Sequence, residues 1–167
     1  AMASAFTEVH RIDEWMSEWK PNSLVTQINN NAGIAPVKVS DEAFETIKQS
    51  IHHSELTNGA FDITFNAFFG LYSWKKGSEH FPSDEDIKRL LPLVNYKNII
   101  LDEKAKTVFL KLKGMKIGLG GMGEGWAVDK VYDLLKPAKF KSGYIDASGA
   151  VRVWGVKPNG KLWVIAV

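Results

Sequence analysis

The 167-residue sequence contains no cysteine, and this absence excludes several kinds of site. Disulfide bonds, zinc–thiolate centres and cysteine nucleophiles all need a thiol. The chain also lacks an apolar run of about 18 residues, the length that a membrane-spanning helix needs, and we identify no signal peptide in it. The formal net charge is only +2. Because basic and acidic residues alternate along the chain, we expect no nucleic-acid partner.

Hydrophobic residues make up 45% of the chain, which is ordinary for a globular domain. Apolar residues recur about one helical turn apart over 6–19, and Pro21 is expected to end this helix. Ser40 and Ser83 are predicted N-caps of two further helices. The inner stripe predicted for the helix after Ser40 consists of Phe44, Ile47 and Ile51. The stripe predicted for a later helix consists of Ala127, Val131, Leu134 and Leu135.

Two segments are typical of antiparallel hairpins. Residues 98–112 combine two strand-like runs with a charged turn. Residues 143–167 contain further strands, which we expect to be joined by a turn at Asn159-Gly160. The final run, KLWVIAV, is a predicted strand whose edge needs a partner. Runs of like elements predict an α+β fold, with antiparallel strands and packed helices in a single domain over 1–167 that ends as if truncated at its C-terminus.

The glycine-rich segment GLGGMGEGWAVD, residues 118–129, allows two interpretations. Its glycines at 118, 120 and 123 match the G-x-G-x-x-G pattern of nicotinamide-dependent dehydrogenases, and Asp146 follows at the distance of a ribose-binding acid. However, Lys113-Gly114 interrupts the strand that should precede the glycines, and little chain remains for further β–α units. The second interpretation is a glycine-rich cradle whose free N–H groups hold another phosphate at the start of a helix.

Four motifs occur in the order found in one protein family. GMGEGWAVDK resembles the G-x-[GA]-[EK]-G-[YW]-A-x-D segment of the ApbE family, the FAD:protein FMN transferases. TNGAFDIT, residues 57–64, is similar to the family's T-[DN]-G-A-[FM]-D-[IV]-T signature. SEWKPNSLVTQIN, residues 17–29, and IDASGAVRVWG, residues 145–155, look like two further family segments. The chain is therefore identified by resemblance as the N-terminal portion of an ApbE-like flavin transferase domain.

The resemblance implies an enzyme that binds FAD as substrate, cleaves its pyrophosphate with Mg²⁺, and attaches FMN to a Thr or Ser of a target protein. The implied target carries a D-x-x-[ST]-x-T motif and is typically a membrane redox subunit. The implied location is periplasmic or otherwise extracytoplasmic, with membrane association through the lipid anchor of a lipoprotein that lies outside this chain. A non-catalytic flavin-binding module or scaffold fragment is the alternative function.

The resemblance also implies site residues, although it assigns no catalytic residue. The implied cofactor-binding residues are Trp19, Asn29, Ala60, Phe61, Asp62, Gly118 and Glu124. Trp19 is the residue expected to stack on the flavin nucleotide, and the backbone carbonyl of Gly121 is the expected Mg²⁺ contact. The other Mg²⁺ ligands of the family lie in a D-A-x-[ST]-T segment downstream. Since a hard cation takes about six oxygens, we expect this chain alone to be an incomplete transferase.

Several of these positions also have a structural interpretation. Trp19 could belong to the core as the last residue of an apolar stripe. Asp62 could bond its own backbone in a turn, and Glu124 could compensate a helix dipole. Asp129 is interpreted as a structural helix residue. Gly118 departs from the family, because many members carry there an Asp that helps to bind FAD.

Overall fold

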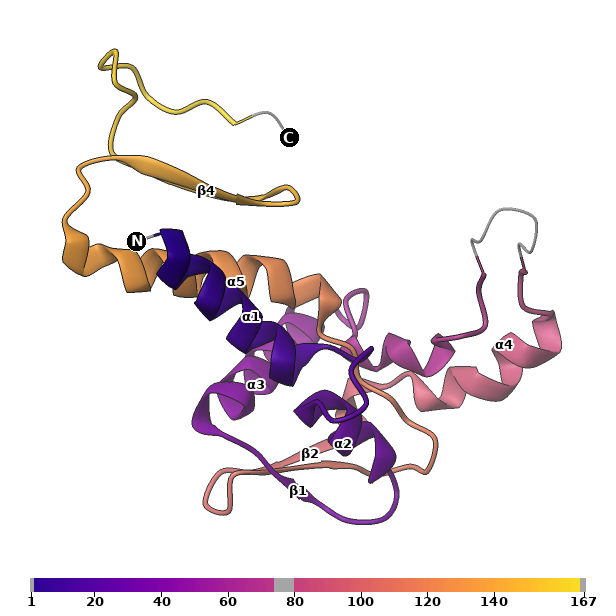
Figure 1. Ribbon diagram of the computed structural model, residues 1–167. Coiled ribbons are helices and arrows are strands. Elements are labelled where there is room, and N and C mark those ends of the chain that lie inside the picture. Colours follow the sequence, from indigo (N-terminus) through magenta and orange to yellow (C-terminus); the bar gives the residue numbers. More distant parts are fainter. Residues whose placement is uncertain (1, 74–79, 166–167) are drawn as a thin grey trace. The chain divides into compact units, whose positions relative to one another are not determined.

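The computed structural model describes residues 2–73 and 80–165 (Figure 1). The chain divides into two compact units. The central unit is Met16–Leu119, and the terminal unit combines Ala1–Trp15 with Gly120–Val167. Among the described helices, none has both the length and the apolar character needed to cross a membrane. The expectation of a single domain over 1–167 stays a prediction.

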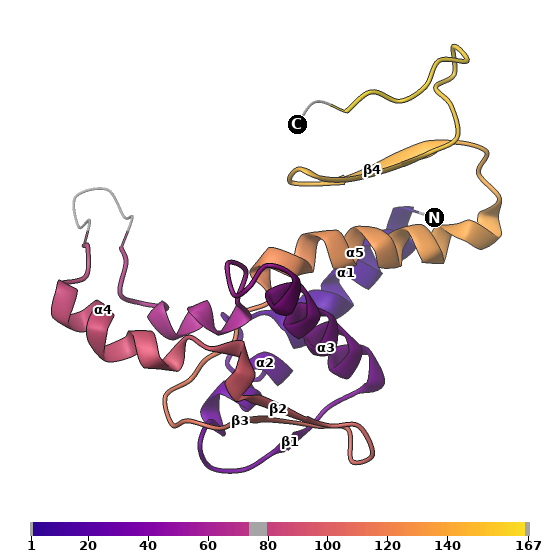
Figure 2. The same cartoon turned by 180° about the vertical axis from the view of Figure 1, so that it is seen from behind.

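The central unit combines helices with a three-stranded antiparallel sheet, whose strand order is β1-β3-β2 (Figure 2). The strands are β1 (Val37–Lys38), β2 (Ile99–Asp102) and β3 (Thr107–Leu110). The helices are α2 (Leu24–Asn30), α3 (Asp41–Leu56), α4 (Asp84–Leu90) and the 3-10 helices η1 (Ile63–Phe68), η2 (Leu91–Leu93) and η3 (Tyr96–Asn98). In the β2–β3 hairpin Leu101 is opposite Val108. The hairpin predicted within 98–112 is therefore confirmed.

The core of the central unit is formed by side chains from nearly every one of its segments. Helix α2 packs on β3, and α3 packs on η1 and η3. The large apolar side chains with at most 1% of their surface exposed are Val25, Ile28, Phe44, Ile47, Val108, Leu110, Met115, Ile117 and Leu119. Three of these nine belong to the short segment 115–119, which has no regular secondary structure over 115–118. The core therefore fixes that segment, which carries Gly118.

Helix α3 confirms its predicted start and two residues of its predicted inner stripe, Phe44 and Ile47, which are both buried. The Ser40 hydroxyl accepts a hydrogen bond from Ala43 N at 3.2 Å, as an N-cap does. Ile51 of the predicted stripe is only half-buried. The buried face instead continues through Thr46, Ser50 and Ser54, whose hydroxyls donate to backbone carbonyls one turn back at 2.8 to 3.0 Å. Hydroxyl groups satisfied in this way can be buried without leaving a polar group unpaired.

Two other helix predictions differ in outcome. Ser83 accepts a hydrogen bond from Asp86 N at 3.1 Å and caps α4, as predicted. The helix expected over 6–19 is α1 (Met2–Met16), which begins earlier and ends before Trp19. The sequence prediction missed α2. An N-cap signal for this helix is nevertheless present at Ser23, whose hydroxyl accepts a hydrogen bond from Thr26 N at 3.0 Å.

The terminal unit contains most of α1, helix α5 (Gly120–Leu135), the 3-10 helix η4 (Lys136–Ala138), and a hairpin of β4 (Gly143–Ala147) and β5 (Ala150–Trp154). Helix α5 packs against both strands. Arg152 of β5 forms an ion pair with Asp129 of α5, and its guanidinium lies 3.9 Å from the Tyr132 ring centroid. The structural interpretation of Asp129 therefore holds, with a partner from the sheet.

Three predictions for the terminal unit differ from the structure. Strands β4 and β5 are joined by a two-residue turn at Ser148-Gly149. The φ angles of these residues are 53° and 107°, which suits a hairpin turn of this kind, since such turns need positive φ. The predicted turn at Asn159-Gly160 joins no strands, and residues 161–165 form no strand; residues 166–167 lie outside the described part. On α5 the buried residues are Ala127, Val128 and Val131, whereas Leu134 is 44% exposed. The mixture of helices with antiparallel strands confirms the α+β prediction.

Candidate functional site

The predicted site residues are divided between the two units. The central unit contains Trp19, Asn29, Ala60, Phe61, Asp62 and Gly118. The terminal unit contains Gly121 and Glu124. The residues of each set are therefore described within their own unit. The two sets differ in kind, because the central set surrounds an irregular, buried segment and the terminal set lies on one helix.

In the central unit, two asparagine side chains hold the peptide group before Gly118. Asn29 accepts from Ile117 N at 2.8 Å and donates its Nδ2 to Ile117 O at 3.0 Å. Asn66 donates its Nδ2 to the same carbonyl at 2.9 Å. Gly118 N donates to Ile63 O at 2.9 Å. These bonds connect α2, η1 and the Gly118 segment, so Asn29 and Gly118 lie in one hydrogen-bonded arrangement.

Asn66 also explains why residue 118 is a glycine. A Cβ atom built on Gly118 would lie 2.8 Å from Asn66 Cγ and 3.1 Å from its Cβ, closer than real Cβ atoms approach their neighbours. A side chain at position 118 would therefore displace Asn66. Sequence reasoning missed Asn66, because an isolated asparagine in the aromatic segment FNAFFGLY carries no signal of a contact 51 residues away.

Asp62 holds the GAFD turn in place through its carboxylate. Its Oδ1 accepts from Thr64 N at 2.8 Å and from Thr64 Oγ1 at 2.6 Å, which caps η1. Its Oδ2 accepts from Tyr96 N at 2.9 Å and so connects η1 to η3. The interpretation of Asp62 as a residue that bonds its own backbone is confirmed. A direct contact with FAD stays a prediction for this residue.

The two residues before Asp62 are held by Thr57, the residue after α3. Ala60 N donates to Thr57 O at 3.1 Å, and Phe61 N donates to Thr57 Oγ1 at 3.0 Å. The chain reverses between them at Gly59, whose φ is 83°. The turn thus presents Ala60 and the half-buried Phe61 on a backbone fixed at both ends.

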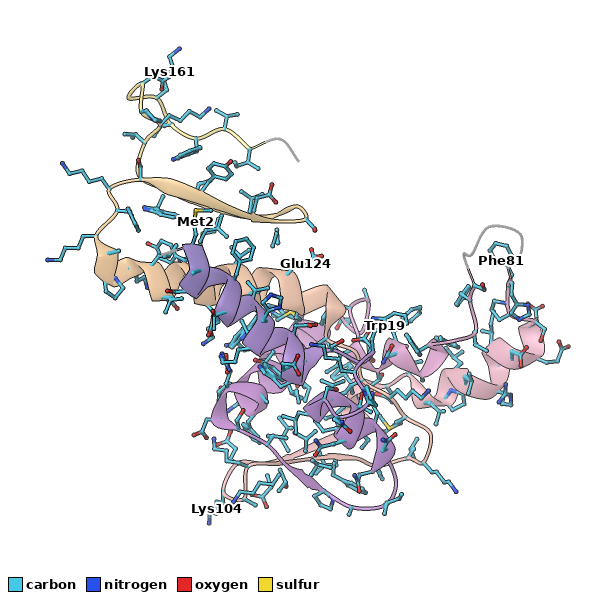
Figure 3. All side chains as sticks on the ribbon, in the orientation of Figure 1. Met2, Trp19, Phe81, Lys104, Glu124 and Lys161 are labelled. Carbon is cyan, nitrogen blue, oxygen red and sulfur yellow. The ribbon has the colours of Figure 1, made fainter. Side chains whose placement is uncertain are left out.

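Trp19 is not a core residue. Its side chain is 75% exposed, so the core interpretation is wrong, and it stands clear of the ribbon in Figure 3. The ring lies 4.6 Å from the Phe69 ring, centroid to centroid, at an angle of 69°. This edge-to-face arrangement fixes the indole while leaving most of its surface available. Stacking on a flavin nucleotide stays a prediction that this exposure permits.

In the terminal unit, the glycines form the beginning of a helix and not the loop before one. Gly120, Gly121 and Gly123 all lie within α5. The first four N–H groups of an α-helix have no partner within it, so a phosphate cradle remains compatible with this structure. The Gly121 carbonyl, however, lies inside the helical hydrogen-bond pattern. Glu124 is exposed on the same helix (Figure 3).

The residues present do not by themselves fit Mg²⁺. Across 2–73 and 80–165 the structure brings together no group of three or more His, Asp or Glu side chains that could hold a metal ion. A single carbonyl such as that of Gly121 leaves about five of the six expected oxygen positions unfilled. The described part of the chain therefore supplies at most one of the implied ligands.

The strand pairing excludes the nicotinamide interpretation of the glycines. A dinucleotide-binding unit places its glycine motif between a strand of a parallel sheet and a helix. Every pair of strands in the described residues is antiparallel, and no strand leads into Gly118. Asp146 accepts from Gly149 N at 3.0 Å and so supports the β4–β5 turn.

Comparison with known proteins gives a consistent result. The chain is 30% identical over 156 residues to the FAD:protein FMN transferase of Klebsiella pneumoniae, covering 93% of this chain and 49% of that protein. The crystal structure of the ApbE protein from Thermotoga maritima matches with a TM-score of 0.86 at 31% identity, over 96% of this chain and 52% of that one. The apo flavinyl transferase ApbE from Pseudomonas stutzeri matches with a TM-score of 0.85 at 26% identity, over 100% and 54%.

The chain spans about half the length of the curated relatives that it matches. The model of the ApbE family matches residues 1–167, and the solved structures share the arrangement of helices and antiparallel strands described above. The family resemblance found in the sequence motifs is thus confirmed: the chain belongs to the ApbE family.

Proposed function

We propose that this chain forms the flavin-nucleotide-binding part of an FAD:protein FMN transferase. The observation that carries the proposal is the surface of the central unit around Trp19. There an exposed indole is fixed by Phe69, and a residue without a side chain, Gly118, is fixed by Asn29 and Asn66 through Ile117. A flat aromatic surface suits a flavin or adenine ring, and a glycine permits close approach of a ligand to the backbone.

In the proposed reaction the hydroxyl of a target Ser or Thr attacks the phosphorus on the FMN side of the FAD pyrophosphate. The new bond joins that phosphorus to the hydroxyl oxygen, the bond to the bridging oxygen breaks, and AMP leaves. The hydroxyl proton passes to solvent. Such transfers depend mainly on positioning and on neutralising charge. In the central unit Trp19 would orient a ring of the nucleotide.

Mg²⁺, the target protein and the location belong to the proposal through the family resemblance. The resemblance implies Mg²⁺, but the described residues do not fit the ion by themselves and would supply at most the Gly121 carbonyl. The protein substrate would carry the D-x-x-[ST]-x-T motif of a membrane redox subunit outside the cytoplasm. The alternative is a flavin-binding module or scaffold fragment without transfer activity.

One experiment separates these functions. The chain is incubated with FAD and a D-x-x-[ST]-x-T peptide, either in MgCl₂ or in EDTA, and FAD binding, AMP release and peptide mass are measured. We expect FAD to bind in both conditions, because the central-unit contacts need no metal. AMP and FMN-modified peptide that form only with Mg²⁺ would assign the transfer to this chain.

Other outcomes of this experiment would limit or contradict the proposed function. Bound FAD that stays intact in both conditions would assign this chain the binding role alone. Failure to bind FAD would contradict the proposal. A peptide with Ala in place of the acceptor Ser or Thr is the matched control, because it removes the attacking hydroxyl and nothing else.

A further inference from the structure

The central unit carries more exposed aromatic surface than its fold requires. Four aromatic side chains between residues 19 and 72 are exposed by 39% or more of their surface, namely Trp19, Phe65, Phe69 and Tyr72. Grouped apolar surface of this kind on a water-exposed face often marks a binding site. Two of the four, Trp19 and Phe69, touch through their rings.

The local structure explains why Phe69 points outward. Helix η1 buries Ile63, Thr64, Ala67 and Phe68. Phe65 and Phe69, four residues apart, are left on its outer side. Phe69 caps the helix, and its N–H donates to Asn66 O at 2.9 Å. The residue that contacts Trp19 is therefore on the same short helix as Asn66, which holds the peptide before Gly118.

A positive charge lies beside this aromatic pair. Burial alternates along the segment before α5, where Met115, Ile117 and Leu119 are fully buried and Lys116 is exposed. The same alternation leaves Gly118, two residues on, less buried than its neighbours. The Lys116 ammonium lies 5.9 Å from the Phe69 ring centroid. Phe69 thus has Trp19 against its ring and a lysine above it.

We propose that Phe69 and Lys116 complete the flavin-nucleotide site that Trp19 begins. This inference rests on the proposed function and deepens it. Phe69 is a positioning residue that sets the plane of the Trp19 indole. Lys116 pairs with a phosphate of the nucleotide whose ring stacks on Trp19. An aromatic surface with an adjacent ammonium group recognises a ring joined to an anion, which is the chemistry of a flavin nucleotide and not of riboflavin.

The difference between FMN and riboflavin provides the test, because the two share a ring system and differ in a phosphate. FAD, FMN and riboflavin are titrated by calorimetry into the wild-type chain, Lys116→Gln and Lys111→Gln. Lys111 is also exposed and no ring contact is assigned to it, so it is the matched control. We expect Lys116→Gln to weaken FMN and FAD about fivefold or more and to leave riboflavin unchanged. Lys111→Gln should change none of the three.

The role of Phe69 is tested by Phe69→Leu, which keeps an apolar side chain without a ring, and by Phe69→Tyr, which keeps the ring. Leucine should weaken FMN and riboflavin by the same factor, and tyrosine should restore both. An equal effect of Lys116→Gln on FMN and riboflavin, or none on either, would overturn the inference while FAD binding by the wild type still supports the proposed function. A wild-type chain that binds no flavin would overturn both.

Discussion

The central and terminal units bury their apolar residues to very different extents. In the central unit nine large apolar side chains have at most 1% of their surface exposed. In the terminal unit none of the described side chains reaches that level, and Met2, Phe6, Leu162 and Val164 are each more than 60% exposed. The terminal unit also contains a groove of about 1160 Å³ between α1, α5 and the hairpin, lined mostly by apolar side chains.

This difference indicates that the two units contribute unequally to the stability of the chain. The central unit has a close-packed interior, and two of its exposed aromatic residues, Trp19 and Phe69, are in ring contact. The terminal unit spreads its apolar residues over the groove and the chain after β5. We infer that the central unit supplies most of the free energy of folding, since buried apolar area is the dominant favourable term.

The largest effect is expected from matched phenylalanine truncations in the two units. Phe44 is fully buried in the central unit and Phe6 is 62% exposed in the terminal unit. Phe44→Ala should lower the free energy of unfolding by about 3–5 kcal/mol, and Phe6→Ala should change it by about 0.5 kcal/mol or less. Urea denaturation followed by circular dichroism measures both. Equal losses would contradict the comparison.

A smaller effect is expected where Asn66 meets Gly118. Gly118→Ala places a Cβ 2.8 Å from Asn66 Cγ and should cost about 1–3 kcal/mol. In an Asn66→Gly background the obstructing side chain is gone, so the same Ala should cost clearly less. A double-mutant cycle on urea midpoints measures the coupling. If the two substitutions are additive, the contact does not explain the glycine.

In the terminal unit the largest polar contribution is expected from Arg152, which pairs with Asp129 and covers Tyr132. Arg152→Ala should lower stability by about 0.5–1.5 kcal/mol, because both contacts are partly exposed. Arg152→Lys should recover only part of this, since lysine keeps the charge but not the planar group over the ring. Thermal melts should give the highest melting temperature for the wild type, then Arg152→Lys, then Arg152→Ala. A melting temperature of Arg152→Lys below that of Arg152→Ala would contradict this prediction.

The smallest effect is expected in the dependence of the melting temperature on acidic pH. Lys48 of α3 hydrogen-bonds Glu103 after β2, and this bond holds the pKa of the Glu103 carboxyl below its usual value. A lowered pKa contributes stability above the unfolded-state value, and that contribution is lost as pH falls through the folded-state value. The gap in melting temperature between wild type and Glu103→Gln should therefore narrow between pH 6 and pH 3, a range set by the ordinary glutamate pKa of about 4.3. A constant gap would show that the pair contributes nothing.

Sequence patterns predicted best what local chemistry determines. The caps at Ser40 and Ser83, the 98–112 hairpin and the α+β class were predicted because each depends on residues within a few positions. The apolar stripe over 6–19 was misleading, because its period is helical but Trp19 lies beyond the helix end and is exposed. Periodicity shows which residues share a face and not what covers it.

The candidate site was predicted only in part for a related reason. The family motifs pointed to Asn29 and Gly118, and the structure joins them through Ile117. Asn66 donates to Ile117 O, Phe69 contacts Trp19 and Lys116 lies over Phe69. These three residues belong to the FNAFFGLY and MKIG segments, where no motif marks them. Their roles come from contacts between distant parts of the chain, such as the 51-residue separation of Asn66 and Ile117, which a single sequence does not reveal.

The most direct test of the account is a calorimetric titration of FAD into the wild-type chain, Trp19→Ala and Phe81→Ala. Phe81 is the matched control, because it is an aromatic residue of the central unit that is 63% exposed. We expect Trp19→Ala to weaken FAD binding by about 1–3 kcal/mol, the usual value of base–aromatic stacking, and Phe81→Ala to leave it unchanged. An unchanged affinity in Trp19→Ala would contradict the claim that the exposed aromatic surface of the central unit holds the flavin nucleotide.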